Sequence, residues 1–187
     1  MDISEIIRYV YVTIGVAILI SIPTIYIRKS YFKKQREVYH WKYEVADICF
    51  IFYLICLFQI TALRFGGIGW DLDNMMSRNT RVNGVPLKEI WIWMVNGRWW
   101  HLFYNVIGNC AWFVPLGLIL PALYRGYRKH LWRTVFIGLI VSTFIEILQF
   151  ILCTGVTDID DVIFNTIGTA MGYMLWASFD WIRSRIK

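Results

Sequence analysis

Five long apolar segments alternate with short polar stretches along the chain. They comprise residues 9–27, 45–63, 102–124, 134–153 and 162–182. Each is close to the roughly 20 residues that a helix needs to cross the hydrocarbon core of a bilayer. The last three segments together also contain Asn, Glu, Gln and Gly. We therefore expect part of the surface of each to face other helices rather than lipid. The pattern predicts an all-α integral membrane protein, a bundle of about five transmembrane helices.

The composition agrees with this interpretation. Of the 187 residues, 58% are hydrophobic and only 17% are charged, whereas soluble domains have roughly 45–50% apolar and about 25% charged residues. A soluble domain of this size has too small a core to cover so much apolar surface, which excludes a soluble enzyme and a disordered chain. The net charge is +6, and the basic residues lie in short runs between apolar segments. We therefore predict no nucleic-acid partner.

The distribution of Lys and Arg predicts how the helices are oriented. Thirteen of the 19 lie in residues 28–44, 125–133 and 183–187, and the other six lie in the N-terminal region and the remaining connections. Cytoplasmic loops are enriched in Lys and Arg, so we predict an N-terminus outside and a C-terminus in the cytoplasm. We also predict that residues 1–44, a helix with a basic cytoplasmic loop, precede a membrane domain of residues 45–187.

The long outer segment, residues 64–101, is predicted to contain a helix of its own. Apolar residues recur at helical spacing between Pro86 and Asn96. Trp93, Trp99 and Trp100 are suited to the headgroup region of a bilayer. We therefore predict a short amphipathic helix lying in the outer membrane interface.

Polar side chains gather toward the outer ends of the predicted third, fourth and fifth spans, and they recur every three or four residues, so they share helix faces. Polar groups in hydrocarbon are costly unless they are paired, and they typically mark a functional cavity. The sequence therefore predicts one polar pocket open to the outer leaflet. Its candidate ligand-binding residues are Arg64, His101, Asn105, Asn109, Glu146, Gln149, Asp158, Asp161 and Asn165.

Structural roles are open for several of these residues. Aspartates at residues 158–161 can cap a helix, intramembrane asparagines can join helices, and Glu146 can form a structural ion pair with Arg64. Glu146 is also the candidate catalytic residue, as a general base. Asp158 and Asp161 can supply oxygens to a divalent cation, but two carboxylates are too few to predict a metal site, so we predict no metal and no cofactor.

Three motifs resemble the VanZ-like family. Residues 105–117 read NVIGNCAWFVPLG and are similar to the family's asparagine-then-PLG signature. Residues 142–149, STFIEILQ, resemble its S…iE..Q pattern, and residues 158–168, DIDDVIFNTIG, resemble its DiDD…NtxG element. The strong resemblance extends over residues 101–172.

The resemblance implies a multi-pass protein of the bacterial cytoplasmic membrane that belongs to the cell envelope. It also implies a link to low-level resistance to teicoplanin, a lipid-tailed glycopeptide. We interpret the pocket as binding a lipid headgroup, a lipid-linked wall precursor or the lipoglycopeptide, with Arg64 contacting an anionic headgroup. The alternative is an intramembrane hydrolase or transferase acting on a lipid-linked envelope substrate, with Glu146 as general base; we predict a binding protein rather than an enzyme. No oligomeric state is predicted.

Overall fold

The computed structural model describes residues 3–35, 41–62, 82–152 and 154–186, and most of them are helical. The chain divides into two compact units, Met1–Gly69 and Trp70–Lys187. Each unit is described by itself. The boundary predicted after residue 44 from charge and hydropathy stays a prediction.

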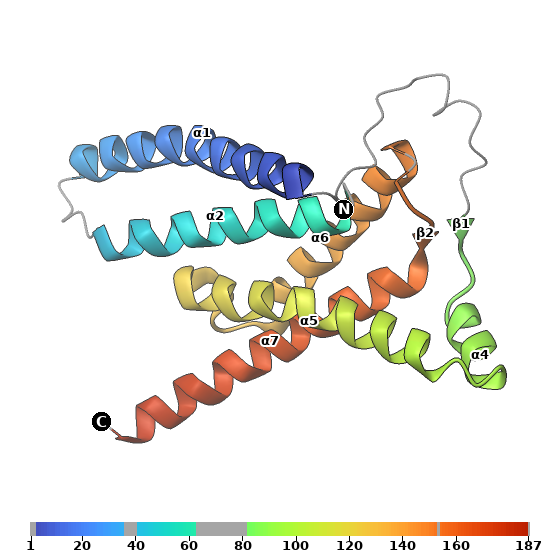
Figure 1. The fold of residues 1–187 in the computed structure, drawn as a ribbon. Helices are drawn as coiled ribbons and strands as arrows, with labels where there is room; N and C mark the ends of the chain where they lie inside the picture. Colours follow the sequence, from blue (N-terminus) through green and yellow to red (C-terminus); the bar gives the residue numbers. More distant parts are fainter. Residues whose placement is uncertain (1–2, 36–40, 63–81, 153, 187) are drawn as a thin grey trace. The chain divides into compact units, whose positions relative to one another are not determined.

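The first unit contains two helices that run side by side, α1 (Ile3–Gln35) and α2 (Trp41–Thr61) (Figure 1). The Thr13 hydroxyl donates a hydrogen bond to the Gln59 side-chain oxygen and so joins them. Both helices include a predicted apolar segment, and both begin earlier in the chain than that segment does. Hydropathy marks the part of a helix that suits lipid, whereas backbone hydrogen bonds continue into the polar flanks.

The described residues of the second unit form helices and two very short strands. In chain order its elements are β1 (Val82–Asn83), α4 (Lys88–Val95), α5 (Trp99–Leu123), the 3₁₀ turn η1 (Arg125–Tyr127), α6 (Leu131–Leu152), β2 (Thr157–Asp158) and α7 (Ile159–Ile186). The two strands pair in parallel and were not predicted. The prediction of an all-α protein is otherwise confirmed, and a helix is present where one was predicted between Pro86 and Asn96.

Three helical stretches of the described residues are long and apolar enough to cross a membrane. They are Glu44–Thr61, Trp99–Leu123 and Leu131–Leu152. A fourth apolar stretch, Thr13–Ile27, is shorter. Helix α7 has 28 residues but is not among the three. The lengths and composition of these helices are those of a membrane protein, and the number of spans stays a prediction.

Helices α5 and α7 cross with their backbones in contact (Figure 1). A Cβ atom built at Gly168 would lie 2.2 Å from the Cys110 carbonyl oxygen, and one built at Gly172 would lie 2.0 Å from the Val114 carbonyl oxygen. Residues further along α7 contact residues further along α5, so the two helices run parallel. Glycine at such positions lets two membrane helices approach closely.

Helix α6 packs on α7 through small and polar side chains. The Asn165 side-chain amide donates a hydrogen bond of 2.9 Å to the Ser142 hydroxyl, and this bond is buried. One turn further along α7, Thr169 is fully buried, and a Cβ atom at Gly138 would lie 2.3 Å from its hydroxyl oxygen. The two contacts fix how α6 and α7 pack against each other.

Candidate functional site

Four acidic residues lie near the place where α6 ends and α7 begins: Glu146, Asp158, Asp160 and Asp161, here called the carboxylate cluster. Asp158 Oδ1 accepts a 2.9 Å hydrogen bond from the Asp160 backbone N–H, as an N-terminal cap does. Asp160 and Asp161 lie in the first turn of α7, where the helix dipole favours negative charge. Helix capping therefore accounts for part of the cluster, which is one of the alternatives left open by the sequence.

The cluster also holds the segment that precedes α4. Val82 pairs with Thr157, and Asn83 pairs with Asp158, in the parallel bridge. The Asn83 amide donates a 2.9 Å hydrogen bond to Asp158 Oδ1. Further along, the Leu87 backbone N–H donates a 2.6 Å hydrogen bond to Asp160 Oδ1. Two aspartates of one short stretch thus position residues 82–87 at the start of α7.

Glu146 connects α6 to the same place. Its side chain is 4% exposed, and its Oε2 atom accepts a 2.9 Å hydrogen bond from the Asp158 backbone N–H. The Thr157 hydroxyl also donates to the Glu146 carbonyl oxygen at 3.4 Å. These contacts position the start of α7, while the catalytic role stays a prediction. Arg64, the partner that the sequence suggested, lies outside the described residues.

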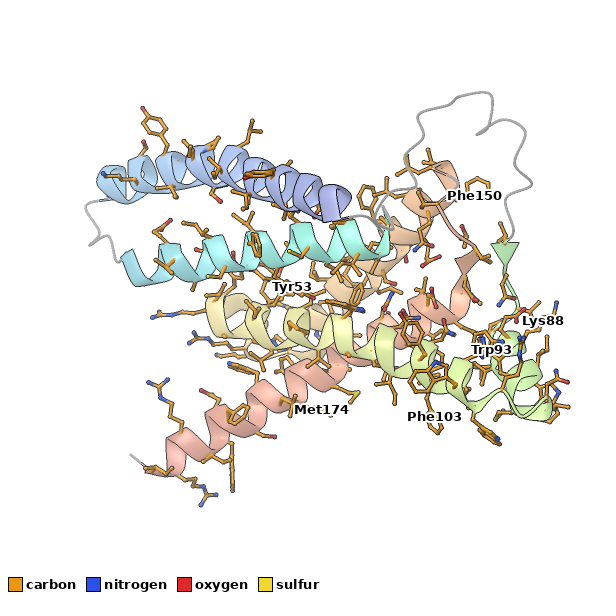
Figure 2. All side chains as sticks on the ribbon, in the orientation of Figure 1. Tyr53, Lys88, Trp93, Phe103, Phe150 and Met174 are labelled. Atoms are coloured by element: carbon orange, nitrogen blue, oxygen red, sulfur yellow. The ribbon has the colours of Figure 1, made fainter. Side chains whose placement is uncertain are left out.

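Helix α5 reaches the cluster through Asn109. Its side-chain amide donates a hydrogen bond to Asp161 Oδ1. Residues of α5, α6, α7 and the 82–87 segment therefore meet at one end of the second unit. Figure 2 shows side chains at this end, including those of Lys88 and Trp93 on α4.

The other candidate residues lie around the cluster rather than in it. Gln149 is buried, three residues beyond Glu146 on α6, and Asn165 bonds to Ser142 one turn along α7. The Asn105 amide donates to the carbonyl oxygen of His101 in its own helix at 2.8 Å. The His101 ring is exposed, with its centroid 6.5 Å from that of Trp93. The structure thus brings Asn109, Glu146, Asp158 and Asp161 together, and leaves His101 and Asn105 at the periphery.

Asp160 was not among the predicted site residues, yet it is the most buried aspartate of the cluster, 4% exposed. Burial raises its pKa, and the charges of Asp158 and Glu89 raise it further, whereas the Leu87 N–H lowers it. Its Oδ2 atom has no hydrogen-bond partner among the described residues. The only sequence signal was its place in the DIDD motif, which also suits a helix cap.

Leu87 and Asn83 were also missed as parts of the site. Leu87 has φ 61° and ψ 10°, the left-handed region, where a residue with a Cβ atom is strained by about 1–2 kcal/mol. The hydrogen bond from its N–H to Asp160 holds the backbone there. A bulky residue in this conformation gives no periodic signal, so the sequence did not reveal it.

We expect Leu87→Gly to stabilise the protein by up to about 1 kcal/mol, because glycine adopts a positive φ without strain. The thermal midpoint in detergent should rise by roughly 2–4 °C for a chain of this length. Val85→Gly is the control, since Leu87 is the one described non-glycine residue with a positive φ. It should lower the midpoint. A lower midpoint for Leu87→Gly as well would show that the leucine side chain contributes more than its backbone costs.

The described residues contain no group of three or more His, Cys, Asp or Glu side chains that can hold a metal ion. The Oδ1 atoms of Asp158 and Asp161 are instead acceptors for amide donors. The arrangement is that of a structural junction, in which carboxylates bind backbone and side-chain N–H groups. It can keep the four segments in register.

Comparison with known proteins agrees with the motifs that form this junction. The profile of the VanZ/LLP1 family matches residues 50–181. Protein VanZ of Enterococcus faecium is 40% identical to the chain over 74 residues, which are 40% of this chain and 45% of that protein. The alignment thus covers less than half the length of this curated relative. No solved structure matches the chain significantly. Because the profile covers well over half of the sequence, the chain belongs to the VanZ/LLP1 family.

Proposed function

We propose that this protein is a multi-pass protein of the bacterial cytoplasmic membrane that lowers susceptibility to teicoplanin. It does so by binding a lipid headgroup, a lipid-linked wall precursor or the lipoglycopeptide itself at its outer end. Membership of the VanZ/LLP1 family and three apolar helices of spanning length support the class of protein. The observation that carries the site is the carboxylate cluster, which joins α5, α6, α7 and residues 82–87 at one end of the second unit.

Charge supports the assignment of this end to the outside. Because α5 and α7 run parallel, their C-terminal ends lie at the opposite end from the cluster. Residues 125–133 contain four Lys or Arg and no Asp or Glu, and residues 183–187 contain three more. By the positive-inside rule the basic end is cytoplasmic. The cluster is then outside, and the C-terminus is inside.

Helix α4 gives the site its access to lipid. Trp91 on α4 is 65% exposed, and Trp99 and Trp100 at the start of α5 are 53% and 77% exposed. Exposed indoles suit the headgroup region of a bilayer. The hydrogen bond between Leu87 and Asp160 positions the first turn of α4. In this proposal the cluster sets the position of an interfacial helix. A lipid or lipid-tailed molecule contacts that helix, with its headgroup near His101 and Asn105.

The position of Glu146 supports binding over catalysis. A general base needs a carboxylate oxygen within reach of a substrate proton, whereas Glu146 Oε2 accepts the Asp158 N–H and the side chain is 4% exposed. In an intramembrane hydrolase or transferase, a carboxylate oxygen of Glu146 would have to face the substrate rather than the Asp158 N–H. We therefore assign Glu146 a positioning role.

The test is drug susceptibility in a glycopeptide-sensitive Gram-positive host that expresses the chain. The wild type should raise the inhibitory concentration of teicoplanin several-fold and leave that of vancomycin, which lacks the lipid tail, unchanged. Glu146→Ala and Arg64→Ala, the two site variants, should each remove this protection at matched membrane levels. Glu146→Gln keeps an acceptor oxygen for the Asp158 N–H and should retain it. Asp180→Asn, a control in the exposed C-terminal part of α7, should retain it. Equal protection against both drugs, or full protection in both site variants, would contradict the proposal.

A further inference from the structure

The end of the second unit opposite the carboxylate cluster is strongly basic. Its described cations, here called the basic end, are Arg125, Arg128, Lys129, Arg133, Arg183 and Arg185. Asp180 is the only acidic residue after residue 161 in the chain. Figure 2 shows Met174 on the half of α7 that leads to this end. The basic end therefore has a large excess of positive charge.

The turn between α5 and α6 is fixed by hydrogen bonds from two of these arginines. The Arg128 guanidinium donates to the carbonyl oxygens of Pro121 and Ala122, both at 2.9 Å. Arg133 donates to the Gly126 carbonyl oxygen at 3.1 Å. The Tyr173 hydroxyl of α7 donates to the Arg128 carbonyl oxygen at 2.8 Å. The last carbonyls of α5 thus have partners, which a helix end otherwise lacks.

This turn presents two further cations to its surroundings. The side chains of Arg125 and Lys129 are exposed. Neither side chain has a hydrogen bond or salt bridge within the described part of the chain. Since the turn that carries them is held by Arg128 and Tyr173, their backbone positions are fixed. Two unneutralised charges on a rigid turn are a suitable site for an anionic group.

Aromatic side chains indicate the depth at which these cations lie. Trp132 and Trp181 are 63% and 60% exposed. The Arg133 guanidinium lies 5.4 Å from the Trp132 ring centroid, and that of Arg185 lies 5.0 Å from the Trp181 ring centroid. Both are within cation–π range. Indoles favour the membrane–water interface, so Arg133, stacked on Trp132 beside the turn, lies at the level of lipid phosphates.

We propose that the basic end binds the headgroups of anionic phospholipids in the cytoplasmic leaflet. The Arg125 and Lys129 side chains contact the phosphate, and the exposed apolar side chains of α6 next to the turn contact the acyl chains. Leu131 and Phe136 are 42% and 53% exposed there. Apolar surface beside unpaired cations fits an amphiphile better than a soluble phosphate. This inference does not depend on the ligand at the outer end.

The full chain, purified in non-ionic detergent, is titrated with phosphatidylglycerol or phosphatidylcholine, and bound lipids are counted by native mass spectrometry. The wild type should bind phosphatidylglycerol more tightly. Arg125→Gln combined with Lys129→Gln should weaken that binding on the order of tenfold, as expected for two cations near an anionic headgroup. Binding of phosphatidylcholine should not change.

Two control variants separate a local site from total charge. Lys88→Gln combined with Arg98→Gln removes the same charge from the opposite end and should weaken phosphatidylglycerol binding much less than the Arg125/Lys129 pair does. Arg125→Lys with Lys129→Arg keeps both charges and should bind as the wild type does. Equal losses in both glutamine pairs would overturn the proposal, as would an unchanged preference in the Arg125/Lys129 pair. Displacement of the lipid by millimolar inorganic phosphate would overturn the assignment to lipid.

Discussion

Replacing Gly168 and Gly172 together by alanine is expected to lower the thermal midpoint of the protein in detergent by about 10 °C or more, from overpacking costs of roughly 1–3 kcal/mol or more at each site. The new Cβ atoms would lie 2.2 and 2.0 Å from backbone carbonyl oxygens of α5. A backbone atom cannot move away by a change of rotamer, as an atom of a flexible side chain can. The two helices must therefore separate, which weakens contacts along the whole crossing.

Gly108→Ala is the matched control for this change. A Cβ atom at Gly108 would have no atom within 4 Å among those tested, and the residue lies within α5. Alanine favours a helix over glycine by about 1 kcal/mol, so the midpoint should stay the same or rise slightly. The measurement is the fraction of monodisperse protein after heating, by size-exclusion chromatography. A double alanine variant as stable as the wild type would disprove the close crossing.

Asp158→Ala should release residues 82–87 from the start of α7. The substitution removes the acceptor for the Asn83 amide and for the Asp160 N–H. Hydrogen bonds to a charged group contribute about 1.5–3 kcal/mol each. Backbone amides of residues 82–88 and the first turn of α7 should therefore exchange with deuterium at least tenfold faster. Hydrogen–deuterium exchange of the protein in detergent, followed by mass spectrometry, measures this directly.

Asp180→Ala provides the comparison within the same helix. Asp180 is exposed near the C-terminal end of α7, so exchange near the cluster should not change. Asp158→Asn retains a side-chain oxygen and should give an intermediate rate. Wild-type exchange in Asp158→Ala would mean that the parallel bridge alone holds the segment, and that the carboxylate contributes little.

The helices were predictable because lipid imposes a simple rule on the sequence. A spanning helix must be apolar for about 20 residues, and α5 and α6 satisfy this over nearly their whole lengths. The spacing of the glycines at residues 168 and 172 is a similar signal, of close packing, because only a missing side chain allows two backbones to touch. Both signals are local in the chain, so hydropathy and spacing are enough to detect them.

The contacts of the site were less predictable because they join distant segments. Nothing near Leu87 indicates that Asp160 will accept its N–H, and a two-residue strand has no periodicity to detect. Asn105 lies about one helical turn before Asn109 on the same face of the helix, and it was expected in the same pocket. Because α5 touches α7 most closely at residues 110–117, the helices diverge toward their N-terminal parts. Asn109 still reaches α7, whereas Asn105 bonds to its own helix.

The parallel bridge has a consequence for the order in which the protein is assembled. Asn83 and Asp158 are separated by 75 positions, and α4, α5 and α6 all lie between them. During synthesis the strand partner of Val82 does not exist until α5 and α6 have both been made. A chain truncated before Thr157 would therefore display residues 82–88 to membrane quality-control proteases. The bridge can therefore close only after α4, α5 and α6 have been made, when α7 is still to follow.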